Sequence, residues 1–406
     1  MKILHLVHRY HPSIDGRQHL FKHLSEGLVA QFQDDVTVFT TNSEGSFREK
    51  PLKLITLAEE VINGVQVKRF SFSQRWTSVL DAARRISRKA RLPLTDYLEI
   101  LYRGPIAIDM FKAMVEFKAD VIAGTPFYGF HMLYPHIAQQ MGYPVPPVVH
   151  WGALHITDDY IRQPALKAIR SAAAYVANTE FEREVLIKKG IPQEKIFVIG
   201  VGVDTKQFTG AEGQRVRETY NLGEGPVVGF IGRQARGKGI DTLIQAMHLV
   251  WKRQPEVRLL IAGARTDYSR ELHRLVRELP ASLHDNVVFV DSFAEAEKPQ
   301  LFAACDVFVS VSRIESFGIV YLEAWASGKP VIGSRIGAVQ NVIQEEEDGL
   351  LVSHCNVSEL AGAISRLLND TPLRLRLARN GKTKVQSEYD WEVVTRKLRH
   401  VYDRIQ

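Results

Sequence analysis

The sequence predicts an α/β protein of two domains, each a doubly wound parallel sheet with helices on both faces. The chain has 406 residues, which corresponds to two or three domains at about 150 residues each. Short apolar runs alternate with amphipathic stretches of helical length, and this alternation starts afresh near residue 226. Such alternation is expected where parallel strands are joined by crossover helices. A polar, glycine-rich stretch at residues 200–225 separates the two series.

Each predicted strand is a short apolar run bounded by polar residues. In the first half these runs are residues 2–7, 36–40, 65–70, 120–123, 148–151, 175–178 and 196–199. In the second half they are residues 226–231, 257–262, 287–290, 306–311, 330–334 and 349–352. We therefore expect Rossmann-like domains at residues 1–205 and 206–389, and a terminal helix at 390–406 whose apolar residues are spaced to dock on a neighbouring element.

Composition and length of the apolar runs exclude several classes of protein. Hydrophobic residues make up 45% of the chain and charged residues 24%, which excludes intrinsic disorder and fibrous folds. No apolar run reaches the length of about 18 residues that a spanning helix needs. The run at residues 3–7 is too short for a signal peptide, so we expect a cytoplasmic protein. We expect Cys305 and Cys355 to be buried small hydrophobes.

A glycine-rich turn follows the first strand of the second half. Residues 232–239 read Gly-Arg-Gln-Ala-Arg-Gly-Lys-Gly and precede a helix expected near residue 240. Glycine lets the backbone approach an anion closely, and Arg233 and Lys238 bring two cations to the same strand end. The turn has neither P-loop nor GxGxxG spacing. We interpret it as a diphosphate-binding loop, the alternative being a glycine-rich turn with solvated basic residues.

A second strand end combines two carboxylates with the start of a helix. Glu315 and Glu323 are eight residues apart, so they reach one site only if Glu315 lies in the loop and Glu323 within the helix. The free amides at residues 317–320 would bind a phosphate there. The alternative is that Glu315 is a first-turn acid favoured by the helix dipole and Glu323 a surface acid.

Together the two motifs resemble those of the retaining, nucleotide-sugar-dependent glycosyltransferases of family 4, and the resemblance covers nearly the whole chain. It implies the GT-B fold, in which two Rossmann-like domains face each other across a cleft. It also implies that Arg233 and Lys238 bind the donor diphosphate, that Glu315 faces the donor sugar, and that Glu323 accepts hydrogen bonds from the ribose hydroxyls. His150 corresponds to a histidine presented to the donor sugar, a structural histidine being the alternative.

Weaker similarities follow in the same order along the chain. Residues 199–204 resemble a motif near the interdomain hinge, residues 323–331 extend the carboxylate motif, and residues 389–391 resemble the start of a helix that crosses back to the first domain. The family's amino-terminal glycine pair appears as Asp15-Gly16. The residues implied to contact the nucleotide-sugar are Gly16, Arg233, Lys238, Gly263, Ser292, Phe293, Glu315, Ser316, Phe317, Gly318, Ile319, Val320 and Glu323. Those implied to act in catalysis are His150, Arg233, Lys238 and Glu315.

The chemistry that these residues predict is transfer of a sugar from a nucleoside diphosphate to a hydroxyl. Two cations and a helix terminus can stabilise the departing diphosphate, and the sequence has no convincing D-x-D motif, so we expect neither a metal nor another cofactor. The resemblance implies retention by front-face attack, with Glu315 as the formal alternative nucleophile. We favour a UDP-sugar over a GDP-sugar, and a carbohydrate or a lipid-linked acceptor. A GT-B phosphorylase, a nucleotide-sugar epimerase and a non-catalytic binding protein are the alternatives.

The net charge of +6 is concentrated in one segment. Residues 68–91 contain eight Lys or Arg residues and one Asp, a net +7, which leaves −1 for the rest of the chain. We therefore expect no nucleic-acid partner. A helix from about Val79 would align Val79, Ala83, Ile86 and Ala90 between arginines. We interpret the segment as a contact to an anionic membrane surface, the alternatives being an acidic soluble acceptor and a solvated face.

Overall fold

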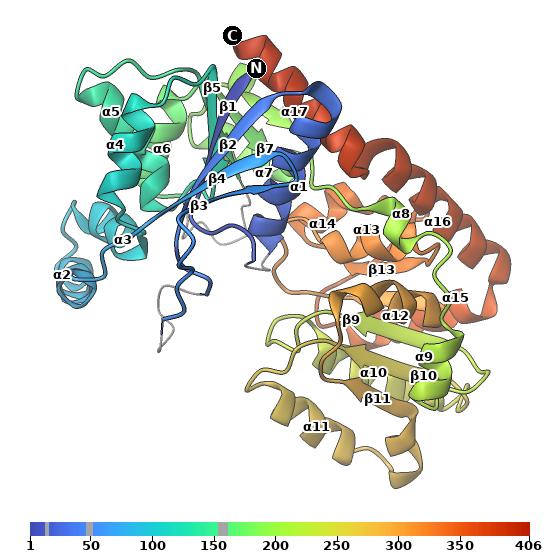
Figure 1. Cartoon of the computed structure of the whole chain (residues 1–406). Helices are drawn as coiled ribbons and strands as arrows, with labels where there is room; N and C mark the ends of the chain where they lie inside the picture. Colours follow the sequence, from blue (N-terminus) through green and yellow to red (C-terminus); the bar gives the residue numbers. More distant parts are fainter. Residues whose placement is uncertain (13–15, 46–51, 153–160) are drawn as a thin grey trace. The chain divides into compact units, whose positions relative to one another are not determined.

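The structure, a computed structural model, describes residues 1–12, 16–45, 52–152 and 161–406. These residues form two compact units (Figure 1). The first consists of Met1–Gly200 with Trp391–Gln406, and the second of Val201–Asp390. The sequence places the divisions after residues 205 and 389, whereas the structure places them after Gly200 and Asp390.

Within the described residues, the sheet of the first unit has eight strands in the order β3-β4-β2-β1-β5-β6-β7-β8. The strands are β1 Lys2–Val7, β2 Asp35–Thr41, β3 Glu59–Ile62, β4 Val65–Phe70, β5 Val121–Thr125, β6 Val148–Trp151, β7 Ala174–Ala177 and β8 Ile196–Val198. Strand β3 pairs antiparallel with β4, and the other neighbours pair in parallel. The sequence analysis missed β3 because this edge strand is largely exposed and carries no buried apolar run.

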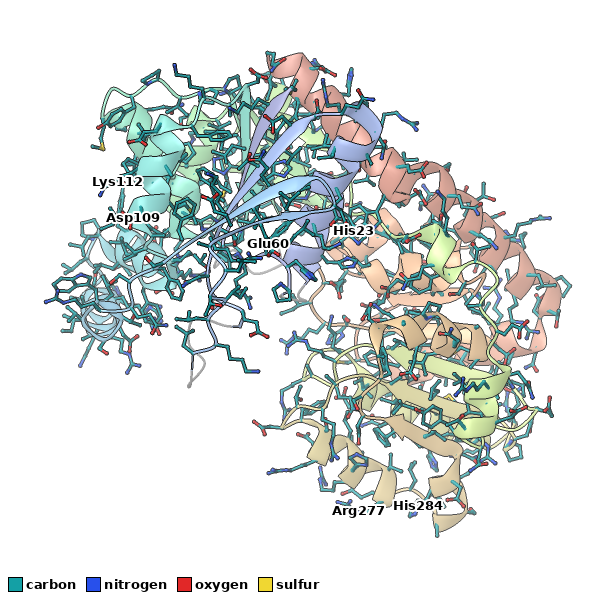
Figure 2. The ribbon with its side chains drawn as sticks, in the orientation of Figure 1. His23, Glu60, Asp109, Lys112, Arg277 and His284 are labelled. Carbon is teal, nitrogen blue, oxygen red and sulfur yellow. The ribbon has the colours of Figure 1, made fainter. Side chains whose placement is uncertain are left out.

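The helices of the first unit include the carboxyl-terminal segment of the chain. They are α1 Gly16–Phe32, α2 Thr77–Lys89, α3 Thr95–Arg103, α4 Ile108–Glu116, α5 Tyr134–Gln140, α6 Gln163–Ser171, α7 Glu180–Lys188 and α17 Trp391–Ile405. Helix α17 packs on α1, where a Cβ at Gly27 would lie 2.6 Å from Thr395 Oγ1. Trp391 stacks on His23 of α1, which is labelled in Figure 2. The apolar residues of α17 therefore have their partner in the first unit.

The described sheet of the second unit has six parallel strands in the order β11-β10-β9-β12-β13-β14. The strands are β9 Val227–Ile231, β10 Arg258–Ala262, β11 Val287–Val290, β12 Val307–Ser310, β13 Val331–Ser334 and β14 Gly349–Val352. The helices are α8 Thr205–Phe208, α9 Gln214–Thr219, α10 Ile240–Trp251, α11 Ser269–Arg277, α12 Lys298–Ala304, α13 Ile319–Ala326, α14 Gly337–Val342, α15 Val357–Asn369 and α16 Thr371–Lys384. This strand order is that of the Rossmann fold.

The two cysteines differ in their surroundings. Cys305 is buried, and its Sγ fills the space beside Gly229 of β9, where a Cβ would lie 2.1 Å away. Cys355 is exposed at a turn with a φ of 60°. The prediction of burial is thus wrong for Cys355, because it follows β14 in a surface turn. No helix in the described ranges has the length and apolarity to cross a bilayer.

Candidate functional site

The loops that carry the two sequence motifs leave neighbouring strands of the second unit. Strands β9 and β12 pair in parallel, and the strand order reverses between them. In open α/β sheets, ligands bind outside the carboxyl ends of the strands at such a reversal. Residues 232–239 follow β9 and residues 311–318 follow β12, so the fold brings both motifs to this point.

Two polar contacts join these loops. The Arg313 amide donates to the Gly237 carbonyl at 2.7 Å. Lys238 Nζ donates to Glu315 Oε2 at 2.9 Å, and the two side chains are 31% and 14% exposed. This pair combines one residue of each predicted motif, although the sequence analysis did not foresee their ion pair. In this arrangement Glu315 neutralises Lys238.

Backbone conformation explains why glycine stands at the helix that follows the β9 loop. Gly239 has a φ of +73°, and a Cβ there would lie 2.3 Å from the Val311 carbonyl oxygen. A side chain would therefore separate the two loops. Gly239 is also the residue before α10. The glycine thus allows the β9 loop to lie against the β12 loop at the start of a helix.

The guanidinium of Arg233 is available to bind a ligand. Its side chain is exposed, and among the described residues it has no hydrogen bond, ion pair or ring contact. Arg236 of the same loop, in contrast, pairs with Glu271 at 2.5 Å and lies over the Tyr268 ring at 4.5 Å. The loop therefore contains one open guanidinium and one that is occupied by structural contacts.

The amino terminus of α13 adds backbone donors. Gly318 precedes the helix with a φ of 95°, and the Tyr321 amide donates to its carbonyl at 2.9 Å. The amides of residues 317–320 have no backbone acceptor within the described part of the chain. Phe317 itself is buried against Tyr389, and the side chains of Ser316, Ile319 and Val320 are half-buried. Unused amides at a helix start can bind a phosphate.

Glu323 lies within α13 and is buried, 6% exposed. The alternative of a surface acid is therefore wrong. Its Oε1 accepts a hydrogen bond from Lys298 Nζ at 2.5 Å, whereas its Oε2 has no partner among the described residues. Burial raises the pKa of Glu323, and the Lys298 ammonium opposes that rise. Sequence reasoning missed Lys298, because nothing in the local pattern links the start of α12 to α13.

Gly263 and Gln234 shape the ends of β9 and β10. Gly263 has a φ of +145°, and a Cβ there would lie 1.9 Å from the Gly232 carbonyl oxygen. The fully buried Gln234 donates through Nε2 to the Gly263 carbonyl and to Asp291 Oδ1, both at 3.1 Å. Gly263 thus permits close packing of the two loops. Gln234 is a further residue of this region that the sequence analysis did not select.

Ser292 and Phe293 follow β11, and the resemblance implies that they flank the nucleobase. Ser292 is exposed and Phe293 is half-buried. The carboxylates of this loop are engaged: Asp291 by Gln234 and by Arg265 at 3.2 Å. Glu295 and Glu297 accept hydrogen bonds from the Lys298 ammonium and the Ala294 amide. The described loop therefore presents backbone and hydroxyl groups rather than an unengaged carboxylate.

Two predicted site residues belong to the first unit. His150 lies in β6 with its side chain 2% exposed, and burial lowers its pKa to about 4, so the imidazole is neutral near pH 7. Within the described residues the ring is enclosed in the first unit, and its contact with the donor sugar, which the resemblance implies, stays a prediction. Gly16 begins α1, and Asp15 lies outside the described residues.

The basic residues of segment 68–91 differ in their surroundings. Lys68 pairs with Glu59 at 3.1 Å and Arg69 pairs with Glu60, both across the β3–β4 ladder. Arg84 is neutralised by carboxylates of α2 and α3. Arg85 and Arg88 also pair, with Asp81 at 2.7 Å and Glu99 at 2.9 Å, but their side chains are 72% and 59% exposed. The cations of the segment therefore do not form one unpaired basic surface.

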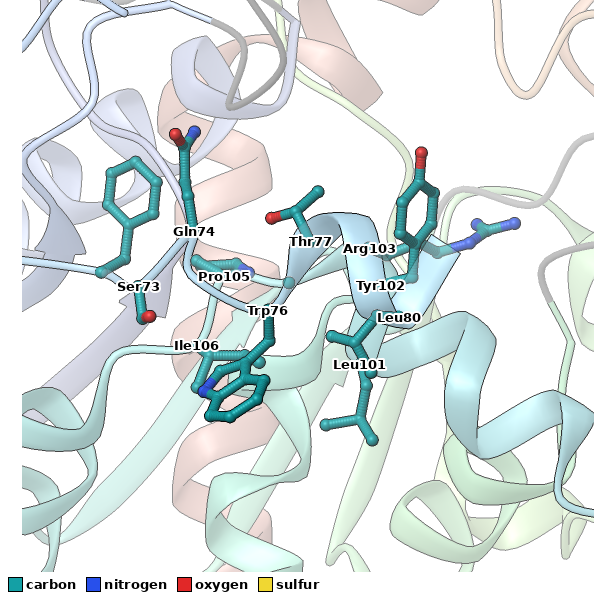
Figure 3. A pocket seen from close by; sticks show the side chains of 12 residues that line it. Ser73, Gln74, Trp76, Thr77, Leu80, Leu101, Tyr102, Arg103, Pro105 and Ile106 are labelled. Atoms are coloured by element: carbon teal, nitrogen blue, oxygen red, sulfur yellow. The ribbon is translucent and has the colours of Figure 1, made fainter. Parts of the chain in front are cut away.

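The exposed cations of the segment lie at residues 75–91, in and beside helix α2. Helix α2, the adjacent α3 and their flanks, residues 75–103, are called the α2–α3 hairpin below. Its exposed large apolar side chains are Trp76, Val79, Ile86, Leu92, Leu94 and Tyr97. Its exposed cations are Arg75, Arg85, Arg88, Lys89 and Arg91. A pocket beside the hairpin is lined by residues 72–74, 76–77, 80 and 101–106 (Figure 3).

Comparison with known proteins identifies the family. The model described as Glycosyltransferase Family 4 matches residues 14–207, and the model described as Glycosyl transferases group 1 matches residues 214–384. The chain belongs to these group 1, family 4 glycosyltransferases. Among the described residues, no group of three or more His, Cys, Asp or Glu side chains could hold a metal ion.

Curated relatives match over part of their length. The D-inositol 3-phosphate glycosyltransferase of Stackebrandtia nassauensis is 33% identical over 223 residues, 52% of this chain and 50% of that protein. The GDP-mannose-dependent alpha-(1-6)-phosphatidylinositol monomannoside mannosyltransferase of Mycobacterium tuberculosis is 31% identical over 216 residues, 51% of this chain and 55% of that protein. The matches therefore span about half the length of these relatives.

Solved structures match over the whole chain. Anabaena Alr3699/HepE in complex with UDP and glucose gives a TM-score of 0.73 at 21% identity and covers 99% of both chains. Sucrose-phosphate synthase from Thermosynechococcus elongatus gives 0.74 at 21% identity, covering 100% of this chain and 99% of that one. At this identity the likeness concerns the fold. The expected GT-B class, with two Rossmann-like parallel-sheet domains, is confirmed.

Proposed function

We propose that the chain is a retaining glycosyltransferase that moves a sugar from a nucleoside diphosphate sugar to a hydroxyl of a carbohydrate or lipid-linked acceptor. The observation that carries this proposal is the Lys238–Glu315 contact at the strand-order reversal. It joins a cationic glycine-rich loop to a carboxylate loop that leads into a helix start. Family membership supports the reaction class.

The site has groups for both charges that develop during transfer. The bond between the anomeric carbon and the diphosphate oxygen breaks, and the released negative charge is stabilised by Arg233, Lys238 and the amides of residues 317–320. Glu315 lies beside the lysine and can face the sugar, on which positive charge develops. In front-face attack, the acceptor oxygen bonds to the anomeric carbon and its proton passes to the leaving phosphate oxygen.

A uridine nucleotide is our proposal for the donor. Guanine presents N1–H and N2–H₂ donors, which a carboxylate accepts well. The carboxylates of residues 291–297 are already engaged in the described structure, whereas the backbone and hydroxyl of Ser292 are suited to the smaller base. The names of the relatives and solved structures include both GDP-mannose and UDP-glucose. Our choice of UDP over GDP therefore rests on the loop at residues 291–297.

Nucleotide binding and turnover test the function. A thermal-shift panel of UDP, GDP and their sugars should show stabilisation by UDP, and transfer should then be followed by NMR of the product anomer. An α-linked product from an α-linked donor is expected. A requirement for sugar 1-phosphate as substrate would indicate a phosphorylase. Conversion of the donor without an acceptor would indicate an epimerase. Nucleotide binding without turnover would indicate a non-catalytic binding protein. Each of these outcomes would contradict the proposal.

We further propose that the α2–α3 hairpin contacts an anionic bilayer, where a lipid-linked acceptor would lie. Exposed cations and exposed apolar side chains occur together in helix α2 and its flanks, where Trp76 is 53% exposed and Ile86 67% exposed. Such a combination favours the interface of an anionic membrane. Arg75 lies over the Trp76 ring at 5.6 Å, so an aromatic side chain and a cation are adjacent at one end of the hairpin.

Vesicle co-sedimentation tests this contact. The protein should bind vesicles with anionic lipid at low salt, and bind them less at high salt. Replacing Arg85 and Lys89 by Glu should weaken binding by about 30-fold or more, because each basic residue contributes about 1 kcal/mol. Ile108→Ser, which changes an equally exposed apolar residue on α4, should leave binding unchanged. Absence of binding to anionic vesicles at low salt would exclude the contact.

A further inference from the structure

The Glu323 carboxylate has one occupied and one open oxygen. Oε1 receives the Lys298 ammonium at 2.5 Å, and Oε2 is buried without a hydrogen-bond partner among the described residues. A buried acceptor without a donor is unfavourable. A hydroxyl donor brought by a ligand would satisfy this acceptor.

Lys298 is itself held in place. It is the first residue of α12, its side chain is 18% exposed, and its ammonium also contacts Glu295 Oε1 at 3.1 Å. Burial acts to lower the pKa of Lys298, but the carboxylates of Glu323 and Glu295 outweigh it and the pKa is raised. The lysine is therefore a charged group with a fixed geometry between α12 and α13.

We propose that Lys298 is a positioning residue: it holds the Glu323 carboxylate charged and oriented, so that Oε2 accepts a hydrogen bond from a ribose hydroxyl of the bound nucleotide. This inference rests on the proposed nucleotide-sugar site. It adds a residue that neither motif contains and assigns it to recognition of the pentose. Lys298 acts through Glu323 and takes no part in bond breaking.

The charge of the pair explains why the lysine is needed. A carboxyl group buried as Glu323 is tends to take up a proton, because burial disfavours its charged form. A protonated carboxyl is a weaker acceptor than a carboxylate. Without the ammonium, Glu323 would also lose the contact that fixes its Oε1. Both changes remove the preference for a ligand with a hydroxyl at this position.

Calorimetric binding of UDP and 2′-deoxy-UDP measures this preference directly. We expect the wild-type protein to bind UDP about tenfold or more tightly than 2′-deoxy-UDP, as for a hydrogen bond to a charged group. In Lys298→Met and in Glu323→Gln the ratio should fall to below about threefold. Lys298→Arg, which retains the charge, should restore most of the ratio and serves as the second variant if Lys298→Met folds poorly.

A matched control separates positioning from a general structural role. Lys329 is another largely buried lysine of the second unit, and its Nζ donates to the Ala303 carbonyl at 2.8 Å. Lys329→Met should leave the UDP to 2′-deoxy-UDP ratio unchanged. In Lys298→Met the ratio should rise again as the pH is raised, because Glu323 then ionises without its lysine.

Two results would overturn the inference. One is a wild-type ratio that persists in Lys298→Met, and the other is an equal loss of affinity for both nucleotides at every pH, which indicates a structural role. Either result leaves the proposed function standing if UDP still binds to the wild type. Failure of the wild type to bind UDP at all would instead contradict the proposed function, and the inference with it.

Discussion

Two of the lysine–glutamate pairs in the second unit differ in their surroundings. Lys238 and Glu315 meet between two loops, and the lysine is 31% exposed. Lys298 and Glu323 meet between two helices, and the Glu323 side chain is buried. The more exposed an ion pair is, the less it contributes to stability, so we expect Lys238 to exchange Glu315 for a ligand phosphate. A buried pair is costly to break, so Glu323 keeps its lysine and offers only its second oxygen.

We predict first that the buried Lys298–Glu323 pair contributes more to the free energy of unfolding than the Lys238–Glu315 pair does. Lys298→Met should lower the free energy of unfolding by about 3–5 kcal/mol at pH 8, because it leaves a buried carboxylate without its counter-ion. Lys238→Met should lower it by less than about 1 kcal/mol. Urea denaturation of the two variants measures this difference. Equal losses would show that burial does not distinguish the pairs.

Catalysis should show the opposite order. Lys238→Met and Arg233→Met should each lower kcat by about 10²–10³, the cost of one preorganised donor to the developing charge, with the thermal midpoint nearly unchanged. Arg236→Met, in the same loop but engaged with Glu271, should stay within about threefold of the wild type. Steady-state kinetics with a donor and an acceptor provide the measurement. A loss in Arg236→Met as large as in Arg233→Met would contradict the assigned roles.

The pH dependence sharpens the difference between the pairs. Burial raises the pKa of Glu323, and removal of the Lys298 ammonium raises it further. An acid whose folded-state pKa is raised favours folding at low pH and loses that contribution as the pH rises through the folded-state pKa. The stability difference between the wild type and Lys298→Met should therefore be smaller at pH 5 than at pH 8. Urea unfolding at both pH values measures this difference. A difference that is constant, or larger at pH 5, would contradict the prediction.

Sequence reasoning selected residues whose positions follow from local patterns, and their roles stay predictions. Arg233, Lys238 and Glu315 occur within a few residues of strand ends, and the strand pattern alone places those ends at one edge of the sheet. Contacts between distant elements were not predictable in this way. Lys298 and Gln234 act through partners on other elements, and no periodicity connects them.

Burial and pairing between elements were less accessible to sequence reasoning. His150 stands at a strand end in the sequence, but β6 lies between β5 and β7 in the sheet and the imidazole is buried; its contact with the donor sugar stays a prediction. Arg69 counts as a free cation in the sequence, yet it pairs with Glu60 of an edge strand that has too few buried apolar residues to be recognised. Burial and pairing across the sheet decide both cases.

The smallest expected effect concerns metal ions. The two cations and the helix start can stabilise the diphosphate charge without a divalent ion, so we expect EDTA to leave kcat unchanged within error. The assay compares activity in EDTA with activity in Mg²⁺ and Mn²⁺. Strict dependence on either ion would mean that Arg233 and Lys238 do not suffice.

Binding of UDP and of uridine to the wild type and to an Arg233→Ala, Lys238→Ala variant, measured by calorimetry, tests the diphosphate site most directly. We predict that the wild type binds UDP about 10²-fold or more tightly than uridine, since charge-assisted hydrogen bonds to phosphate are strong. The double variant should lose most of this preference while binding uridine as before. A double variant that keeps the wild-type preference for UDP would contradict the account.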